Sequence, residues 1–235
     1  MFDVKSVVRG GISLKDTWGM IKYNRNWQKE NADNFLSFGT IVFCGEMGAG
    51  KSLSANRLIS DIVSVKEDIL VISNTDLYYF DCVPYMGLET IENADNGKRG
   101  IICFFDEIQN QFPSTISKEL SDDWIKLLSF LRKKHILIVG TAPIFSRLAK
   151  PFRESFEYVV LTDNCFFSLI QHNQWFKCNV ECKALGDGNE ENTHNMRLEK
   201  NHYFSRSVRD FKRYDTFETV NIIKSDDRKE NKNRR

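Results

Sequence analysis

Five short apolar runs begin at residue 40 and recur through the middle of the chain. Each run is rich in β-branched or aromatic residues and lacks the alternation of apolar and polar positions that marks a half-exposed strand. Continuous apolar runs of this length are typical of strands buried on both faces, as in a parallel sheet. The predicted strands are residues 40–44, 69–73, 101–105, 136–140 and 158–161.

Helical patterns separate several of these runs. In residues 55–65 and 117–131, apolar side chains recur every three or four positions and so share one helix face. Residues 144–154 are a further predicted helix, interrupted by Pro151, and residues 76–87 are expected to form a loop. Strands that alternate with helices indicate βαβ units with right-handed crossovers. The predicted fold class is therefore α/β, with a parallel sheet flanked by helices.

Both ends of the chain depart from this central pattern. The first 38 residues are polar and are expected to form an arm that includes a helix over residues 14–28. After residue 162, aromatic residues occur in short stretches between polar clusters, a pattern typical of antiparallel hairpins. The predicted organisation is an N-terminal arm over 1–38, a core over 39–162, a small β-rich C-terminal appendage over 163–223 and a polar, disordered tail over 224–235.

Composition narrows the class of protein. Of the 235 residues, 41% are hydrophobic and 28% are charged, which is ordinary for a globular protein. No apolar stretch reaches the ~18 residues of a membrane-spanning helix, and the N-terminus lacks the pattern of a signal peptide. The net charge is +1, so any nucleic-acid site has to be a local basic patch.

The six cysteines favour a reducing compartment, which we expect to be the cytoplasm. Cys44 and Cys103 lie inside apolar runs, where reduced and buried thiols are expected. Cys178 and Cys182 lie near two histidines, His172 and His194. Their spacing fits no common zinc pattern, so a zinc site is the less favoured alternative.

A phosphate-binding pattern follows the first predicted strand. Residues 45–52, GEMGAGKS, match G-x-x-x-x-G-K-[ST] at every fixed position, between a buried strand and a helical pattern. Such a loop wraps a nucleotide phosphate with backbone N–H groups, and the helix N-terminus adds partial positive charge. Lys51 is expected to reach the β- and γ-phosphates, and the Ser52 hydroxyl to bind Mg²⁺. The expected nucleotide-binding residues are Gly45, Glu46, Met47, Gly48, Ala49, Gly50, Lys51 and Ser52.

Two acidic residues, Asp106 and Glu107, directly follow the third predicted strand. Ligands in open α/β sheets lie beyond the carboxyl ends of the strands, which places both acids near the phosphate-binding loop. Asp106 is expected to hold Mg²⁺, and Glu107 to orient or deprotonate the attacking water. The pair favours hydrolysis of ATP over a small-molecule kinase, which often lacks the second acid.

Further candidates follow the fourth predicted strand. Thr141 is placed to sense the γ-phosphate, and a role as a turn cap is equally compatible with the sequence. Arg147 and Arg153 are candidate arginine fingers for a neighbouring subunit, and an ordinary surface arginine is the more common outcome for each. Basic clusters at 132–135 and 206–213 are candidate contacts to DNA, although a solvated face is more common.

Together these features resemble the zonular occludens toxin-like ATPases, the assembly and export motors of filamentous phages. Those motors are similar to the FtsK–HerA class, which includes viral genome-packaging ATPases. The resemblance covers residues 38–162 well. It is carried by the strand 69–73 followed by Asn74, the sequence Asp106-Glu107-Ile108-Gln109, the segment LRKKHILIVGTA, Arg153 and Tyr214-Asp215-Thr216.

The resemblance implies a P-loop NTPase fold of the RecA/FtsK–HerA type that binds ATP and Mg²⁺. It places Lys51 and Ser52 at the phosphates and metal, Asp106 on Mg²⁺, and Glu107 as the catalytic base. It also implies a homo-oligomeric ring, with a hexamer as one expectation from related motors, and DNA of either strand form as partner. The chain departs from the family in two respects: the segment after the fourth core strand reads Thr141-Ala142-Pro143, without the usual glutamine, and no membrane span or extracytoplasmic domain is evident.

We therefore expect a Mg²⁺-dependent ATPase motor that translocates or packages DNA for a phage or mobile element in the cytoplasm of a bacterial or archaeal host. Two alternatives stay open. One is a zonular occludens toxin-like motor for virion assembly or export, acting with a capsid or membrane partner. The other is a nucleotide-gated switch that binds a partner and turns over slowly, which the missing glutamine mildly favours.

Overall fold

The computed structural model describes residues 14–30, 38–66, 68–116, 122–178 and 197–212. The chain separates into two compact units, Met1–Asn34 and Phe35–Arg235. The first contains helix α2 (Leu14–Glu30), which the sequence predicts over residues 14–28, and its described apolar side chains, such as Trp18 and Tyr23, are exposed. Within the described residues, no helix has the length and apolar character needed to cross a membrane.

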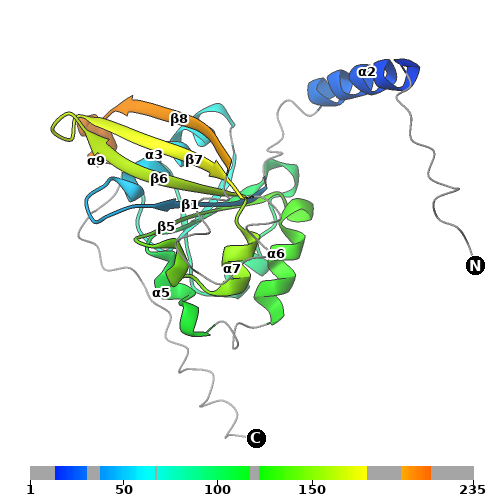
Figure 1. The fold of residues 1–235 in the computed structure, drawn as a ribbon. Coiled ribbons are helices and arrows are strands. Elements are labelled where there is room, and N and C mark those ends of the chain that lie inside the picture. Colours follow the sequence, from blue (N-terminus) through cyan, green and yellow to red (C-terminus); the bar gives the residue numbers. More distant parts are fainter. Residues whose placement is uncertain (1–13, 31–37, 67, 117–121, 179–196, 213–235) are drawn as a thin grey trace, which may run out of the picture. The chain divides into compact units, whose positions relative to one another are not determined.

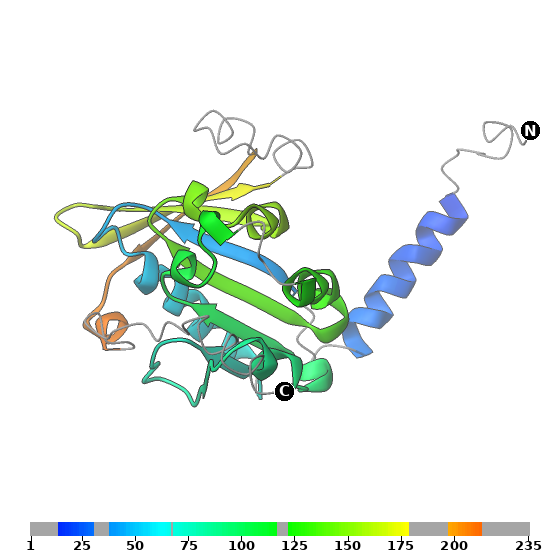
Figure 2. The ribbon, with the colours of Figure 1, turned by 90° about the horizontal axis from the view of Figure 1, so that it is seen from below.

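An eight-stranded sheet forms the centre of the second unit (Figure 1). Its strands lie in the order β3-β2-β4-β5-β1-β6-β7-β8, with parallel pairing from β3 to β6 and antiparallel pairing from β6 to β8. Strand β5 lies between β1 and β4, and all three point the same way (Figure 2). The strands are β1 (Gly39–Cys44), β2 (Leu70–Ser73), β3 (Val83–Pro84), β4 (Ile101–Phe105), β5 (Ile136–Ala142), β6 (Tyr158–Cys165), β7 (Ile170–Lys177) and β8 (Arg197–Ser205).

Helices cover both faces of the parallel part of the sheet. Helices α5, α6 and α7 lie together on one side, and α3 lies on the other (Figure 1). The helices of this unit are α3 (Lys51–Val65), α4 (Leu88–Glu92), α5 (Ile108–Gln111), α6 (Asp122–Lys134), α7 (Lys150–Ser155) and α9 (Val208–Phe211), with the 3₁₀ turns η1 (Gly97–Arg99), η2 (Ser114–Ile116) and η3 (Phe145–Arg147).

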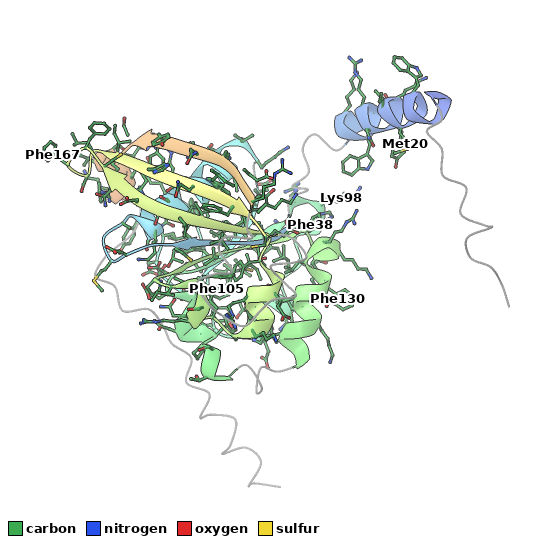
Figure 3. All side chains as sticks on the ribbon, in the orientation of Figure 1. Met20, Phe38, Lys98, Phe105, Phe130 and Phe167 are labelled. Carbon is green, nitrogen blue, oxygen red and sulfur yellow. The ribbon has the colours of Figure 1, made fainter. Side chains whose placement is uncertain are left out.

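Strand β4 shows why the central runs are apolar throughout. Alternate residues of the strand enter two separate cores: Cys103 and Phe105 pack towards α5–α7, whereas Ile102 and Phe104 pack towards α3. The Phe105 ring makes an edge contact with Tyr85 at 4.9 Å between centroids and lies in the layer below the sheet (Figure 3). Burying one such side chain contributes about 1.5–3 kcal/mol, so apolar residues at every position stabilise a strand with two covered faces.

Two predicted segments differ in detail. The helix expected over 144–154 is divided into η3 and α7, because Pro151 falls in the first turn of α7, where its missing N–H costs no hydrogen bond. The loop expected over 76–87 contains the short strand β3, and its Pro84 is tolerated because β3 is the edge of the sheet.

The antiparallel strands after residue 162 continue the core sheet. Strand β7 pairs with β6 along its whole length and β8 pairs with β7, so the boundary predicted between residues 162 and 163 falls inside β6. Within Phe35–Arg235 the chain forms one compact unit. Residues 179–196 and 213–235, which contain the rest of the predicted appendage and the tail over 224–235, lie outside the described residues.

Candidate functional site

The phosphate-binding pattern forms the loop between β1 and α3, as the sequence predicts. Two of its glycines, Gly48 (φ +81°) and Gly50 (φ +92°), have left-handed backbones that favour glycine. The Ala49 N–H donates to the Glu46 carbonyl at 3.1 Å and closes the turn. Lys51 is buried, and its Nζ donates to the same carbonyl at 3.0 Å. The loop is therefore curled around the amino group of its own lysine.

The carboxylate of Asp106 is the point at which the predicted site residues meet. Its Oδ1 accepts hydrogen bonds from the Ser52 hydroxyl at 2.7 Å and from the Thr141 hydroxyl at 2.6 Å. These residues follow or lie near the ends of β1, β4 and β5, which are neighbours in the sheet. The structure thus brings together the loop, the first acid and Thr141.

Asn74 fixes the backbone of Asp106. Its side-chain Nδ2 donates to the Asp106 carbonyl at 2.9 Å, and its Oδ1 accepts from the Asp106 N–H at 2.8 Å. Asn74 is buried at the end of β2, the neighbour of β4. The sequence singled out Asn74 only as part of a family resemblance, and the structure gives it a position that holds the first acid.

Glu107 has a strained backbone. Its φ of +52° is uncommon for a residue with a side chain, and such strain gathers at functional sites. The Glu107 N–H donates to the Thr141 hydroxyl oxygen at 2.9 Å, and Gln109 Nε2 donates to Glu107 Oε2. Thr141 therefore links the two acids, donating to one and accepting from the other.

The oxygen atoms at this site suit a magnesium ion. Mg²⁺ prefers oxygen ligands and is commonly held by one or two carboxylates together with substrate phosphates and waters. The Ser52 hydroxyl and the Asp106 carboxylate, already in contact, supply ligands of this kind. Within the described ranges no cluster of three or more His, Cys, Asp or Glu side chains could hold a metal, and Cys182 and His194 of the alternative zinc site lie outside those ranges.

The β6–β7 hairpin supplies four polar side chains that contact the end of β1, the phosphate loop and α3. Thr162 Oγ1 donates to the Cys44 carbonyl at 3.0 Å, and Asn164 Nδ2 donates to the Gly48 carbonyl at 3.1 Å. From β7, Gln171 Nε2 donates to the Ala49 carbonyl at 2.8 Å. The fourth residue, Asn173, accepts from the Ser54 hydroxyl at 3.0 Å. Sequence reasoning missed these residues; the available signal was their alternate spacing, 162 and 164 on one strand and 171 and 173 on the next.

Of the two candidate arginine fingers, Arg153 lies away from the chain's own phosphate loop. The carbonyl of Ser155, at the end of α7, accepts from the Thr40 hydroxyl at 2.6 Å, and Thr40 lies at the start of β1. Arg153, half-buried and less than one helical turn earlier, thus lies towards the end of β1 opposite to the loop. Arg147 is exposed on η3.

The basic cluster at 132–135 ends α6, where its positive charges favour the helix C-terminus. Lys134 Nζ donates to the Glu92 carbonyl at 2.9 Å, and the Arg132 guanidinium lies 5.6 Å from the centroid of the Phe38 ring. Because α6 leads into β5, this cluster lies at the amino end of that strand, away from Asp106.

The arginines of the second basic cluster contact the protein itself. Arg206 lies 5.1 Å from the Phe211 ring centroid, and Arg209 lies 4.8 Å from that of Tyr79 and donates to its hydroxyl. These contacts join α9 to the rest of the unit. Arg213, at the end of the cluster, lies outside the described residues.

Cys44 and Cys103, which the sequence predicts to be buried, are buried, and this burial determines the protonation of their thiols. Burial raises the pKa of Cys44 to about 12, with the nearby positive charge of Lys51 acting in the opposite direction. Burial also raises the pKa of Cys103 to about 12. Both thiols are therefore protonated at neutral pH and poorly reactive.

Comparisons with known proteins identify the fold. No protein-family model and no curated protein matches the sequence. Among solved structures, the chain is similar to the N-terminal domain of zonular occludens toxin from Neisseria meningitidis, with a TM-score of 0.52 and 12% identity over 76% of this chain and 100% of that domain. It is also similar to the genome packaging NTPase B204 from Sulfolobus turreted icosahedral virus 2 in complex with ATP-gammaS, with a TM-score of 0.46 and 11% identity over 73% of this chain and 93% of that one.

At these identities the likeness is one of fold. The predicted architecture, a mostly parallel sheet flanked by helices with a phosphate-binding loop after β1, is confirmed. The resemblance to the zonular occludens toxin-like ATPases that the sequence indicated is confirmed as a likeness of fold. This chain therefore has the fold of the P-loop NTPases and shares it with the N-terminal domain of zonular occludens toxin.

Proposed function

We propose that this chain is a Mg²⁺-dependent ATPase motor of a phage or mobile element, and that it couples ATP hydrolysis to DNA translocation during genome packaging. The observation that carries the proposal is the meeting of the Ser52 and Thr141 hydroxyls on one oxygen of Asp106. A buried lysine in the adjoining loop and a second acid beside Asp106 complete the arrangement. A site of this composition suits hydrolysis of a nucleoside triphosphate.

The residues divide the work of binding a triphosphate. The backbone N–H groups of residues 45–52 and the ammonium of Lys51 would offset the charge of the phosphates. Ser52 and Asp106 would hold Mg²⁺, which supplies further positive charge at the β- and γ-phosphate oxygens. To receive a nucleotide, the Lys51 Nζ has only to exchange the Glu46 carbonyl for a phosphate oxygen.

Glu107 would act as the general base. Its carboxylate accepts a proton from the attacking water, and the hydrogen bond from Gln109 orients that carboxylate. Thr141 would sense the γ-phosphate through Asp106. A movement of the Asp106 carboxylate would shift the Thr141 hydroxyl, and this hydroxyl also accepts the hydrogen bond from the Glu107 N–H. This bond is a route by which loss of the γ-phosphate could be coupled to movement.

A homo-oligomer is part of the proposal. Arg153 lies towards the opposite end of β1 from its own phosphate loop, so it can contribute to a nucleotide only in a neighbouring copy. A ring of copies, with six as one expectation, would bring such an arginine to each site. The proposal includes a capsid protein or a membrane assembly protein as a further partner.

A second candidate is a motor for virion assembly or export, with a virion protein in place of DNA as cargo. It is supported by the fold shared with the zonular occludens toxin domain and by the self-contacts of Arg206 and Arg209. Arginines that already stack on aromatic rings offer less to a DNA backbone than solvated ones.

The test is the rate of ATP hydrolysis with and without single- and double-stranded DNA, at several salt concentrations. A DNA motor is expected to be stimulated several-fold by one strand form, and the stimulation should weaken as salt rises. Measurable hydrolysis that is indifferent to both DNA forms would contradict the DNA motor and favour the assembly motor. Slow hydrolysis with nucleotide-dependent binding of a protein partner would favour a switch.

A further inference from the structure

A fully buried polar side chain of β7 contacts the phosphate loop. Gln171 is fully buried, and its Nε2 donates to the Ala49 carbonyl and to the Asp163 carbonyl, both at 2.8 Å. One amide group thus ties the loop to the neighbouring strand β6. Its Oε1 is buried without a hydrogen-bond partner, so the side chain is held by its two donor bonds.

The loop and Gln171 approach each other more closely than any side chain at Gly50 would allow. A Cβ added at Gly50 would lie 2.2 Å from Gln171 Oε1, far inside van der Waals contact. The left-handed backbone of Gly50 already favours glycine, and the amide gives a second reason for it. The last glycine of the loop and Gln171 are therefore fitted to each other.

A neighbouring contact repeats the pattern. Asn164 Nδ2 donates to the Gly48 carbonyl at 3.1 Å, so two consecutive loop carbonyls are held by amides of the hairpin. The tip of the same hairpin carries Phe167, which points away from the core (Figure 3). The polar side chains at 164 and 171 thus reach the loop, whereas the aromatic side chain at the tip does not.

The geometry of the peptide bond gives these contacts a consequence for binding. In a trans peptide the C=O and N–H groups point in opposite directions. When Gln171 holds the Ala49 carbonyl, it also directs the Gly50 N–H to the opposite side of the loop. An N–H so directed is ready to bind an anion without reorientation, which raises affinity.

We propose that Gln171 is a positioning residue for nucleotide binding, which sets the Ala49–Gly50 peptide so that the Gly50 N–H faces the phosphates. This inference rests on the proposed nucleotide site. Glutamine suits the position because it is neutral, long enough to reach the loop and able to donate twice. An apolar replacement leaves the Ala49 and Asp163 carbonyls buried without their donor.

The test uses the full chain with Gln171→Met, which keeps the length of the side chain and removes its donors. The matched control is Gln174→Met, because Gln174 lies on the same strand and an odd number of residues away, on the opposite face. The measurements are the dissociation constant of the non-hydrolysable analogue adenylyl imidodiphosphate with Mg²⁺, the KM and kcat for ATP, and thermal unfolding.

Gln171→Met is expected to raise the dissociation constant and KM by about tenfold, since two hydrogen bonds are lost, while kcat changes less because the acids are untouched. Gln174→Met should bind as the wild type does. Asn164→Ala is expected to raise the dissociation constant by a smaller factor, about twofold, since its contact is exposed.

Two results would overturn the inference. If the Gln171→Met variant folds and binds the analogue with wild-type affinity, the Gln171 amide does not position the Ala49–Gly50 peptide for binding. Equal losses in Gln171→Met and Gln174→Met would show a general effect on the sheet. If instead the wild-type chain binds neither ATP nor the analogue, the proposed function fails and this inference fails with it.

Discussion

The hydroxyl of Thr141 donates to Asp106 at 2.6 Å and accepts from the backbone N–H of Glu107 at 2.9 Å. Thr141 lies on β5 between the strands that carry the phosphate loop and the two acids, and it is fully buried. The sequence left two roles open, a sensor and a turn cap. The observed contacts join Thr141 to both acids, and on this geometry we propose the sensor role.

Thr141→Val should slow hydrolysis while leaving nucleotide affinity nearly unchanged. Valine has a similar shape but neither donates to Asp106 nor accepts from Glu107, so the base loses its positioning. The expected loss in kcat is on the order of tenfold or more. Thr141→Ser, which keeps the hydroxyl, is the matched control and should retain most of the rate. Wild-type kcat in Thr141→Val would exclude the proposed link.

Asn74→Ala should lower the free energy of unfolding by about 1–3 kcal/mol, because two buried groups of Asp106 lose their partners. Urea denaturation followed by tryptophan fluorescence measures this change. Asn110→Ala is the comparison, since Asn110 is exposed on α5 and should change stability by less than about 0.5 kcal/mol. Equal losses of stability in the two variants would mean that the two hydrogen bonds from Asn74 to the Asp106 backbone do not stabilise the fold more than an exposed side chain does.

Glu107→Gly is expected to abolish hydrolysis without lowering stability. Glycine adopts the left-handed backbone at this position without strain, which stabilises the folded state by about 1 kcal/mol. The added glycine also raises the entropy of the unfolded chain, which destabilises the folded state by about 1 kcal/mol, so the two effects offset each other. Glu89→Gly, in the first turn of α4, has no strain to relieve and should lose about 0.5–1 kcal/mol. Denaturant titrations of both variants decide the matter, and a Glu107→Gly variant that is the less stable of the two would argue against strain.

The thiols of Cys44 and Cys103 should resist alkylation at pH 8 in the folded protein and react after unfolding. Their pKa values of about 12, against an ordinary value of 9.0, keep them protonated. Because the folded-state pKa is raised, the stability linked to these thiols is present below pH 9 and is lost as pH rises towards 12. Site-resolved mass spectrometry after iodoacetamide treatment tests this, with the half-buried Cys82 and Cys165 as reactive comparisons.

The sequence predicted the elements whose residues carry a local signal. The parallel strands were readable because both of their faces are buried, and the phosphate loop because its glycines and Lys51 have a fixed spacing. Asp106, Glu107 and Thr141 were found because they lie at strand ends, where sites in such sheets form.

Contacts between distant segments could not be predicted in this way. Gln171 lies 122 positions from the loop carbonyl that it holds, and its alternate spacing with Asn173 indicates a shared strand face but not that this face is buried against the loop. The pairing of β7 with β6 likewise depends on backbone groups that every residue carries, so the sequence suggested hairpins but not that they extend the main sheet. Arg153 was singled out as a candidate arginine finger on the predicted helix 144–154, and its distance from the chain's own site became visible only in the fold.

The measurement that tests the central claim most directly is steady-state ATP hydrolysis in the presence of Mg²⁺, with Lys51→Ala and Glu107→Gln beside the wild type. The account predicts hydrolysis by the wild type that EDTA abolishes, none by either variant, and retained ATP binding in Glu107→Gln. Hydrolysis by Glu107→Gln at the wild-type rate, or a wild-type chain that binds ATP and never hydrolyses it, would contradict the account.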